Sequence, residues 1–98
     1  MQIEFAADRW RRLAIDVKFT ADFDRAIVKA YRKVIGFIAT ANDERDIRAY
    51  KALRLEKLKG DRSHQYSLRL NAKYRLIIEI KAADPKNIIV VVNIEDYH

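Results

Sequence analysis

The feature that most constrains the fold of this chain is a change in the spacing of its apolar residues near residue 54. Before that point, apolar side chains recur three and four residues apart, as on one face of a helix. Beyond it they alternate with polar residues or run together in short blocks, as in β strands. A chain of 98 residues with this pattern is expected to be one α+β domain, residues 1–98, with its helices packed on a sheet.

The helical half predicts a short strand followed by three helices. Ile3 and Phe5 alternate with polar neighbours, as in a strand. The apolar face of the first helix is formed by Trp10, Leu13, Ala14 and Val17. Thr20 is expected to cap the second helix, whose apolar stripe is formed by Phe23, Ile27, Ala30, Tyr31, Val34 and Ile38. After a turn at residues 40–43, a shorter helix carries Ile47, Tyr50 and Leu53.

The second half predicts antiparallel strands. Residues 66–71 alternate between apolar and polar side chains, and turn residues 71–73 lead into a second strand at 74–80, so the two should form a hairpin. A second turn follows at residues 82–87. Residues 88–94 are almost all β-branched, which predicts a central strand covered on both faces.

The amino-acid composition limits which kinds of chemical site the chain can hold. The chain has no cysteine, which excludes disulfides, thiolate metal sites and a cysteine nucleophile, and its two histidines do not cluster. We therefore expect neither a metal nor a cofactor. The segment Met1–Asp8 lacks the apolar core of a signal peptide, and the longest apolar run, Ile88–Val92, is too short to span a membrane. A soluble cytoplasmic protein is expected.

The net charge of +6 is concentrated in residues 54–75, which hold seven basic and two acidic side chains. Such a cluster is typical of a surface that binds a polyanion. Charge alone does not distinguish among RNA, DNA and an acidic protein.

Two clusters could carry chemistry. Arg69 and Arg75 fall on paired strands, where two guanidinium groups can converge on one phosphate, although strand arginines also commonly shield a sheet edge. Asp96, Tyr97 and His98 follow the last strand; histidine can transfer a proton near neutral pH and tyrosine can stack on a base. The end of a chain is also commonly frayed.

The ordered set of these short sequences resembles the HigB branch of the RelE-type toxins. The shared residues are Leu55–Asp61, Gln65–Asn71, Lys73–Ile77 and Asp96–His98. The resemblance is strong over residues 53–98 and is one of length and layout over the first half. It implies a RelE-like fold, in which N-terminal helices pack on a small, mostly antiparallel twisted sheet. It also implies metal-independent cleavage of messenger RNA on the ribosome, and inhibition by a helix-turn-helix antitoxin of the HigA type.

Ten residues are candidates for the site: the resemblance gives roles to seven of them, and Lys57, Arg62 and Lys73 are added from the basic cluster of residues 54–75. The catalytic set is His98, Asp96, Tyr97, Arg75 and Lys59, and the RNA-binding or phosphate-binding set is Arg69, Asn71, Lys57, Arg62 and Lys73. In this scheme the arginines stabilise charge on the phosphate. His98 and Asp96 transfer protons, and which of them is the base stays open. Many relatives have a histidine at the position of Glu56, so no catalytic role is expected there.

Two other functions remain open at this point. A ParE-like toxin would keep the fold and inhibit a topoisomerase by protein contact. A module that binds nucleic acid without cutting it would account for the charge. Paired arginines and a terminal Tyr97-His98 favour the nuclease, because an inhibitor that acts by protein contact needs no phosphate site.

Overall fold

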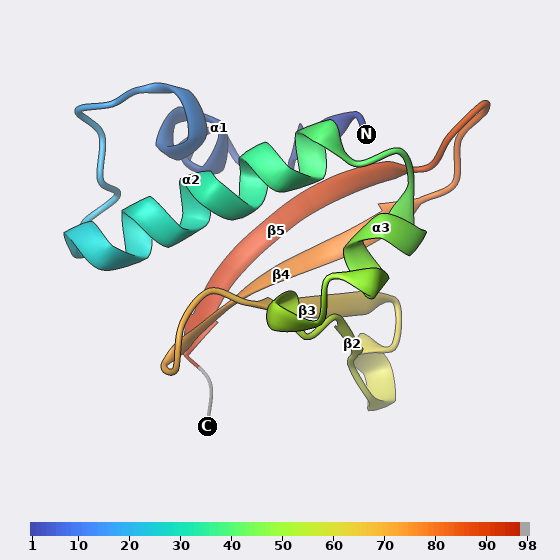
Figure 1. Cartoon of the computed structure of the whole chain (residues 1–98). Coiled ribbons are helices and arrows are strands. Elements are labelled where there is room, and N and C mark those ends of the chain that lie inside the picture. Colours follow the sequence, from blue (N-terminus) through green and yellow to red (C-terminus); the bar gives the residue numbers. More distant parts are fainter. Residues whose placement is uncertain (97–98) are drawn as a thin grey trace.

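The computed structural model describes residues 1–96, which form a five-stranded sheet with helices packed on one face (Figure 1). In chain order the elements are β1 (Ile3–Phe5), α1 (Asp8–Ile15), α2 (Arg25–Thr40), α3 (Glu44–Ala49), β2 (Glu56–Lys57), β3 (Gln65–Arg69), β4 (Tyr74–Lys81) and β5 (Ile88–Asp96). Two short 3-10 helices, η1 (Lys51–Leu53) and η2 (Gly60–Arg62), flank β2. The predicted α+β class is confirmed. No helix in residues 1–96 combines the length and apolar character needed to cross a membrane.

The sheet is mixed, and its order is β1-β5-β4-β3-β2. The pairs β5–β4 and β4–β3 are antiparallel, as predicted. The pair β3–β2, which was not predicted, is also antiparallel, whereas β1 runs parallel to β5. The first and last strands are therefore neighbours, and β5 lies inside the sheet. The turn of the β3–β4 hairpin and the end of β5 lie at the same end of the sheet, because Tyr74 pairs with Asp96.

Helix α1 is shorter than the apolar spacing predicts. Trp10 and Leu13 are buried, but Val17 lies beyond the helix and is 80% exposed, so its predicted place in the core is wrong. Arg32 of α2 closes this end of α1. Its guanidinium group donates to the carbonyl oxygens of Leu13 (3.0 Å), near the end of α1, and of Asp16 (2.8 Å) and Phe19 (3.2 Å), just beyond it.

The start of α2 also differs from the prediction. The N-cap is Asp24, whose carboxylate accepts from the backbone N–H of Ile27 at 3.0 Å. Thr20 cannot hold that position, because Ala21 and Asp22 have positive φ angles of 51° and 65° and break the helical path. The predicted stripe nevertheless forms the inner face of α2, where Ile27, Tyr31, Val34 and Ile38 are buried.

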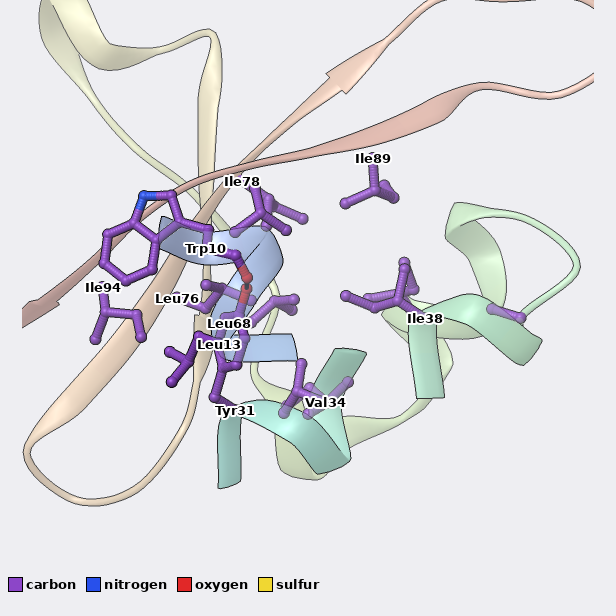
Figure 2. Close-up of a cluster of buried hydrophobic side chains, with 14 of the residues drawn as sticks. Trp10, Leu13, Tyr31, Val34, Ile38, Leu68, Leu76, Ile78, Ile89 and Ile94 are labelled. Atoms are coloured by element: carbon purple, nitrogen blue, oxygen red, sulfur yellow. Dashed lines mark hydrogen bonds between the residues drawn. The ribbon is translucent and has the colours of Figure 1, made fainter. Parts of the chain in front are cut away.

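The hydrophobic core lies between the helices and the sheet. Figure 2 shows its principal side chains, which are Trp10, Leu13, Tyr31, Val34, Ile38, Leu68, Leu76, Ile78, Ile89 and Ile94. A buried polar contact joins the two helices: the Tyr31 hydroxyl of α2 donates to the carbonyl oxygen of Trp10 in α1 at 2.8 Å.

The face of the sheet away from α1 and α2, here called the open face, is mostly polar. Leu76 and Ile78 of β4 face the helices, so Ile77 between them faces the open side, yet Ile77 has 0% exposure. Ile77 of β4 is thus buried on the open face, whereas β5 was the strand predicted to be covered on both faces. The outward residues Ile88 and Val90 of β5 stay partly exposed.

Candidate functional site

The open face carries two arginines side by side. In the β3–β4 pairing, Arg69 lies directly opposite Arg75, and the next open-face pair along these strands is Ser67 with Ile77. Directly paired residues of an antiparallel sheet project from the same face. The two arginines that the sequence placed on paired strands therefore lie on one face.

A hollow of about 150 Å³ lies around these arginines. Its lining residues are Arg54, Glu56, Ser67, Arg69, Asn71, Ala72, Tyr74 and Arg75. Three arginines against one glutamate make its formal charge positive. Nowhere in residues 1–96 do three histidine, aspartate or glutamate side chains gather as ligands of a metal ion would. Positive charge in the hollow is supplied by guanidinium groups, which bind phosphate oxygens with paired hydrogen bonds.

The shape of the hollow depends on the β3–β4 hairpin. The Asn71 side-chain oxygen accepts from the backbone N–H groups of Lys73 (2.9 Å) and Tyr74 (2.7 Å), which closes the turn. An asparagine is suited to this because its side chain mimics a backbone turn. Asn71 thus holds β3 and β4 in the register that aligns Arg69 with Arg75.

Arg54 and Glu56 were not among the predicted site residues. Arg54 ends η1 in a left-handed conformation (φ 49°, ψ 58°), and Glu56 pairs with Ser67 at the edge of the sheet. The strand β2 that positions Glu56 has two residues, too few to show an alternating pattern. The available signal was the charge cluster of residues 54–75, which includes both side chains.

Three predicted lysines lie outside the lining of the hollow. Lys57 pairs with Tyr66, whose side chain packs against the core, so Lys57 belongs to the helix-facing side of β2. Lys59 is exposed at the start of η2. Lys73 lies in the hairpin turn, with its ammonium nitrogen 5.4 Å from the centre of the Tyr74 ring. Their predicted contacts with RNA remain predictions.

Strand pairing places Asp96 on the helix side of the sheet, and Asp96 is not among the residues that line the hollow. Asp96 pairs with Tyr74, and Tyr74 packs against Phe23 on the helix side, with ring centres 6.0 Å apart. The residue of β5 that faces the open side beside Arg75 is Glu95. The predicted catalytic residues Tyr97 and His98 lie outside the described residues.

The predicted phosphate ligand Arg62 lies on the open face but outside the lining of the hollow. Its guanidinium group forms an ion pair with Glu95, with a nitrogen–oxygen distance of 2.9 Å. The structure thus brings Arg69, Arg75 and Asn71 together and gives Arg62 a different partner.

Comparisons with known proteins agree with this architecture. Residues 3–98 match the model of the family described as the RelE-like toxin of type II toxin–antitoxin system HigB. A YoeB/ParE toxin from Agrobacterium tumefaciens has the same fold, with 17% identity over the whole of both chains and a TM-score of 0.62. Toxin chains from Staphylococcus aureus are also similar. One, from a YoeB–YefM complex, has 20% identity over 100% of this chain and 97% of that chain, with a TM-score of 0.60. No curated protein matches the chain significantly in sequence. Because the family model spans nearly the whole chain, this protein belongs to the RelE-like toxins of type II toxin–antitoxin systems, in the HigB group.

Proposed function

We propose that this toxin is a ribosome-dependent endoribonuclease that cuts messenger RNA without a metal ion. The observation that carries the proposal is the hollow in which Arg69 and Arg75 lie side by side, with Arg54 and Glu56 in the same lining. Membership of the RelE-like toxins supports it, because cleavage of messenger RNA is the activity that the resemblance to this family implies. A phosphate group of a backbone is the ligand that such a group of arginines binds best.

The chemistry uses the substrate's own 2′-hydroxyl as the nucleophile. Its oxygen attacks the adjacent phosphorus as its proton leaves to a base, and the bond to the 5′-oxygen breaks as that oxygen takes a proton from an acid. The products are a 2′,3′-cyclic phosphate and a free 5′-hydroxyl. Arg69 and Arg75 stabilise the negative charge that grows on the phosphate oxygens.

We assign the base to Glu56 and the acid to His98. Glu56 is the carboxylate in the lining of the hollow, whereas Asp96 belongs to the opposite face. Histidine gives up a proton readily near neutral pH. From the sequence, the base could be either His98 or Asp96. The present assignment makes Glu56 the base instead, although the resemblance gave Glu56 no catalytic role.

The partners follow from the same proposal. The protein would act on messenger RNA held by the ribosome in the cytoplasm. It would be bound and inhibited by an antitoxin; the structurally similar YoeB of Staphylococcus aureus forms a toxin–antitoxin complex with YefM. We propose a small helix-turn-helix antitoxin of the HigA type, encoded in the neighbouring reading frame.

The decisive experiment maps new RNA 5′ ends in cells after brief induction of the toxin. Wild type should create them within coding sequences, and purified toxin with intact ribosomes should cut in the presence of a chelator and leave cyclic phosphate ends. Arg69→Ala and Arg75→Ala should each lower the cleavage rate by ~10²-fold, because each removes charge stabilisation from the transition state. Arg48→Ala is the matched control, since Arg48 is exposed on α3, away from the hollow.

Two outcomes would contradict the proposal. Growth arrest without new 5′ ends would favour a toxin that acts by protein contact, as a ParE-like inhibitor does. Loss of cleavage in the chelator, restored by magnesium while ribosomes stay intact, would show that the metal-free mechanism is wrong.

A further inference from the structure

Arg62 of η2 makes three hydrogen bonds across the open face. Its two terminal nitrogens donate to the two carboxylate oxygens of Glu95, at 3.2 and 2.9 Å. Its Nε donates to the side-chain oxygen of Gln65 at 3.1 Å. Paired donors facing paired oxygens form the strongest and most directional contact available to an arginine.

The pairing of the strands shows what this side chain crosses. Gln65 lies opposite Glu79, and Glu95 lies opposite Arg75. Between these two rows runs the row of Ser67, Ile77 and Asn93. A side chain bonded to both Gln65 and Glu95 must pass over that middle row. This explains why Ile77 has 0% exposure on a face that α1 and α2 do not cover.

The contact belongs to a network that spans three strands. The Gln65 side-chain nitrogen donates to Glu79 at 3.1 Å, and the Asn93 side-chain nitrogen donates to Glu95 at 3.5 Å. Arg62 is the link between them, and it joins segments 33 residues apart in the chain. One segment is the loop that contains Lys59, and the other is the end of β5 that leads into Asp96.

The position of Glu95 gives this link a functional meaning. Glu95 is the open-face residue of β5 directly opposite Arg75. If Glu95 had no other partner, its carboxylate would compete with a substrate phosphate for the Arg75 guanidinium group. Arg62 engages both of its oxygens and balances its charge.

We propose that Arg62 is a positioning residue, which holds Glu95 away from Arg75 and fixes the end of β5 against the η2 loop. The inference rests on the proposed nuclease function for its effect on cleavage. It replaces direct phosphate binding as the role of Arg62. The pair is partly exposed, with 40% of the Arg62 side chain and 28% of the Glu95 side chain accessible, so its loss leaves the fold intact.

The test is a set of variants in which uncharged glutamine replaces one or both side chains of the pair: R62Q, E95Q and the double variant R62Q/E95Q. R62Q should lower cleavage by about tenfold, because it leaves a carboxylate uncompensated beside Arg75, an interaction of the size that neighbouring charges show in double-mutant cycles. The double variant should recover most of the activity, because the released carboxylate is gone. R45Q is the matched control, since Arg45 pairs with Asp43 at 2.8 Å on α3, away from the hollow.

A direct phosphate contact by Arg62 predicts a different result. The double variant would then be no more active than R62Q, because the missing cation is not restored by removing Glu95. That outcome would overturn the proposal.

Amide hydrogen exchange tests the link without relying on cleavage. R62Q and E95Q should each speed exchange in residues 58–64 and at the end of β5, whereas R45Q should not. Unchanged exchange in R62Q would also overturn the proposal. If wild type does not cleave RNA, the proposed function fails, and the exchange rates still decide whether Arg62 holds the loop to β5.

Discussion

Tyr31 carries a hydroxyl group into the core, where it has 0% exposure. The hydroxyl donates to the Trp10 carbonyl oxygen and so ties α2 to α1. Burial raises the pKa of Tyr31 far above its ordinary range, because the phenolate would lose its hydration. The folded protein therefore keeps a proton that the unfolded chain releases at alkaline pH.

This linkage predicts how stability depends on pH. Because the folded pKa of Tyr31 is the higher one, its contribution is complete below the unfolded pKa of about 10 and is lost as pH rises above that value. Tyr31→Phe should cost about 1 kcal/mol near neutral pH, from the lost hydrogen bond. It should also make the free energy of unfolding fall less steeply above about pH 10. Urea unfolding at several pH values measures both effects.

The control for Tyr31 is Tyr50→Phe. Tyr50 is 42% exposed, and its ring packs edge-on against Phe37 with centres 4.9 Å apart. Its hydroxyl is not enclosed, so this variant should keep the alkaline loss of wild type. Equal pH dependence of the Tyr31 variant and wild type would show that the buried hydroxyl does not contribute to the alkaline loss of stability.

Among the elements, α2 depends most clearly on one local contact. Asp24→Ala removes the side-chain acceptor of the Ile27 N–H and should lower the free energy of unfolding by about 1 kcal/mol. Thr20→Ala should have little effect, because Thr20 precedes the turn and does not cap the helix. Thermal or urea unfolding of both variants checks this. A larger loss for Thr20→Ala than for Asp24→Ala would contradict the observed helix start.

The elements that the sequence predicts well are those with long apolar patterns. The stripe of α2 and the alternation through β3 indicate which face is buried, because each pattern repeats over several turns or residue pairs. Boundaries were less predictable. Thr20 and Asp24 are both good caps, and the choice depends on the positive φ angles of Ala21 and Asp22, which no composition rule indicates.

Pairing between distant segments was the least predictable part of the fold. The parallel contact of β1 with β5 joins Ile3 to Ile89, and local spacing carries no information on it. The candidate site shows the same limit. Arg69 and Arg75 could be placed together from a hairpin alone, whereas Glu56 enters the hollow through β2, and Arg62 finds Glu95 across the sheet.

At the scale of the whole molecule, the sheet and the hydrophobic core described above are formed by residues 1–96. Strand β5 ends at Asp96, and its last buried side chain is Ile94. Deleting Tyr97 and His98 should therefore leave the free energy of unfolding within about 1 kcal/mol of wild type. Toxicity and RNA cleavage should be lost, because the proposed acid and the tyrosine that would stack on the base leave together. Growth assays after induction, with unfolding measurements on the purified protein, test both halves.

Arg75→Ala is the companion variant for this deletion. It removes a cation from the hollow and no side chain from the hydrophobic core. Toxicity should therefore be lost while the free energy of unfolding stays close to that of wild type. A truncated protein that folds normally and still arrests growth would refute a catalytic role for the last two residues. A toxin that acts by contact with a protein target would then be the better account.

The place of β5 in the sheet has a consequence for the order of events during synthesis. Of the five strands, β5 is the last to leave the ribosome, and it lies between β1 and β4. Until it emerges, β1 has no neighbour and the sheet cannot close. A nascent chain that still lacks β5 therefore lacks the strand that joins β1 to the rest of the sheet. Toxicity, whatever its target, is expected only of chains in which β5 has been synthesised and has paired with β1 and β4.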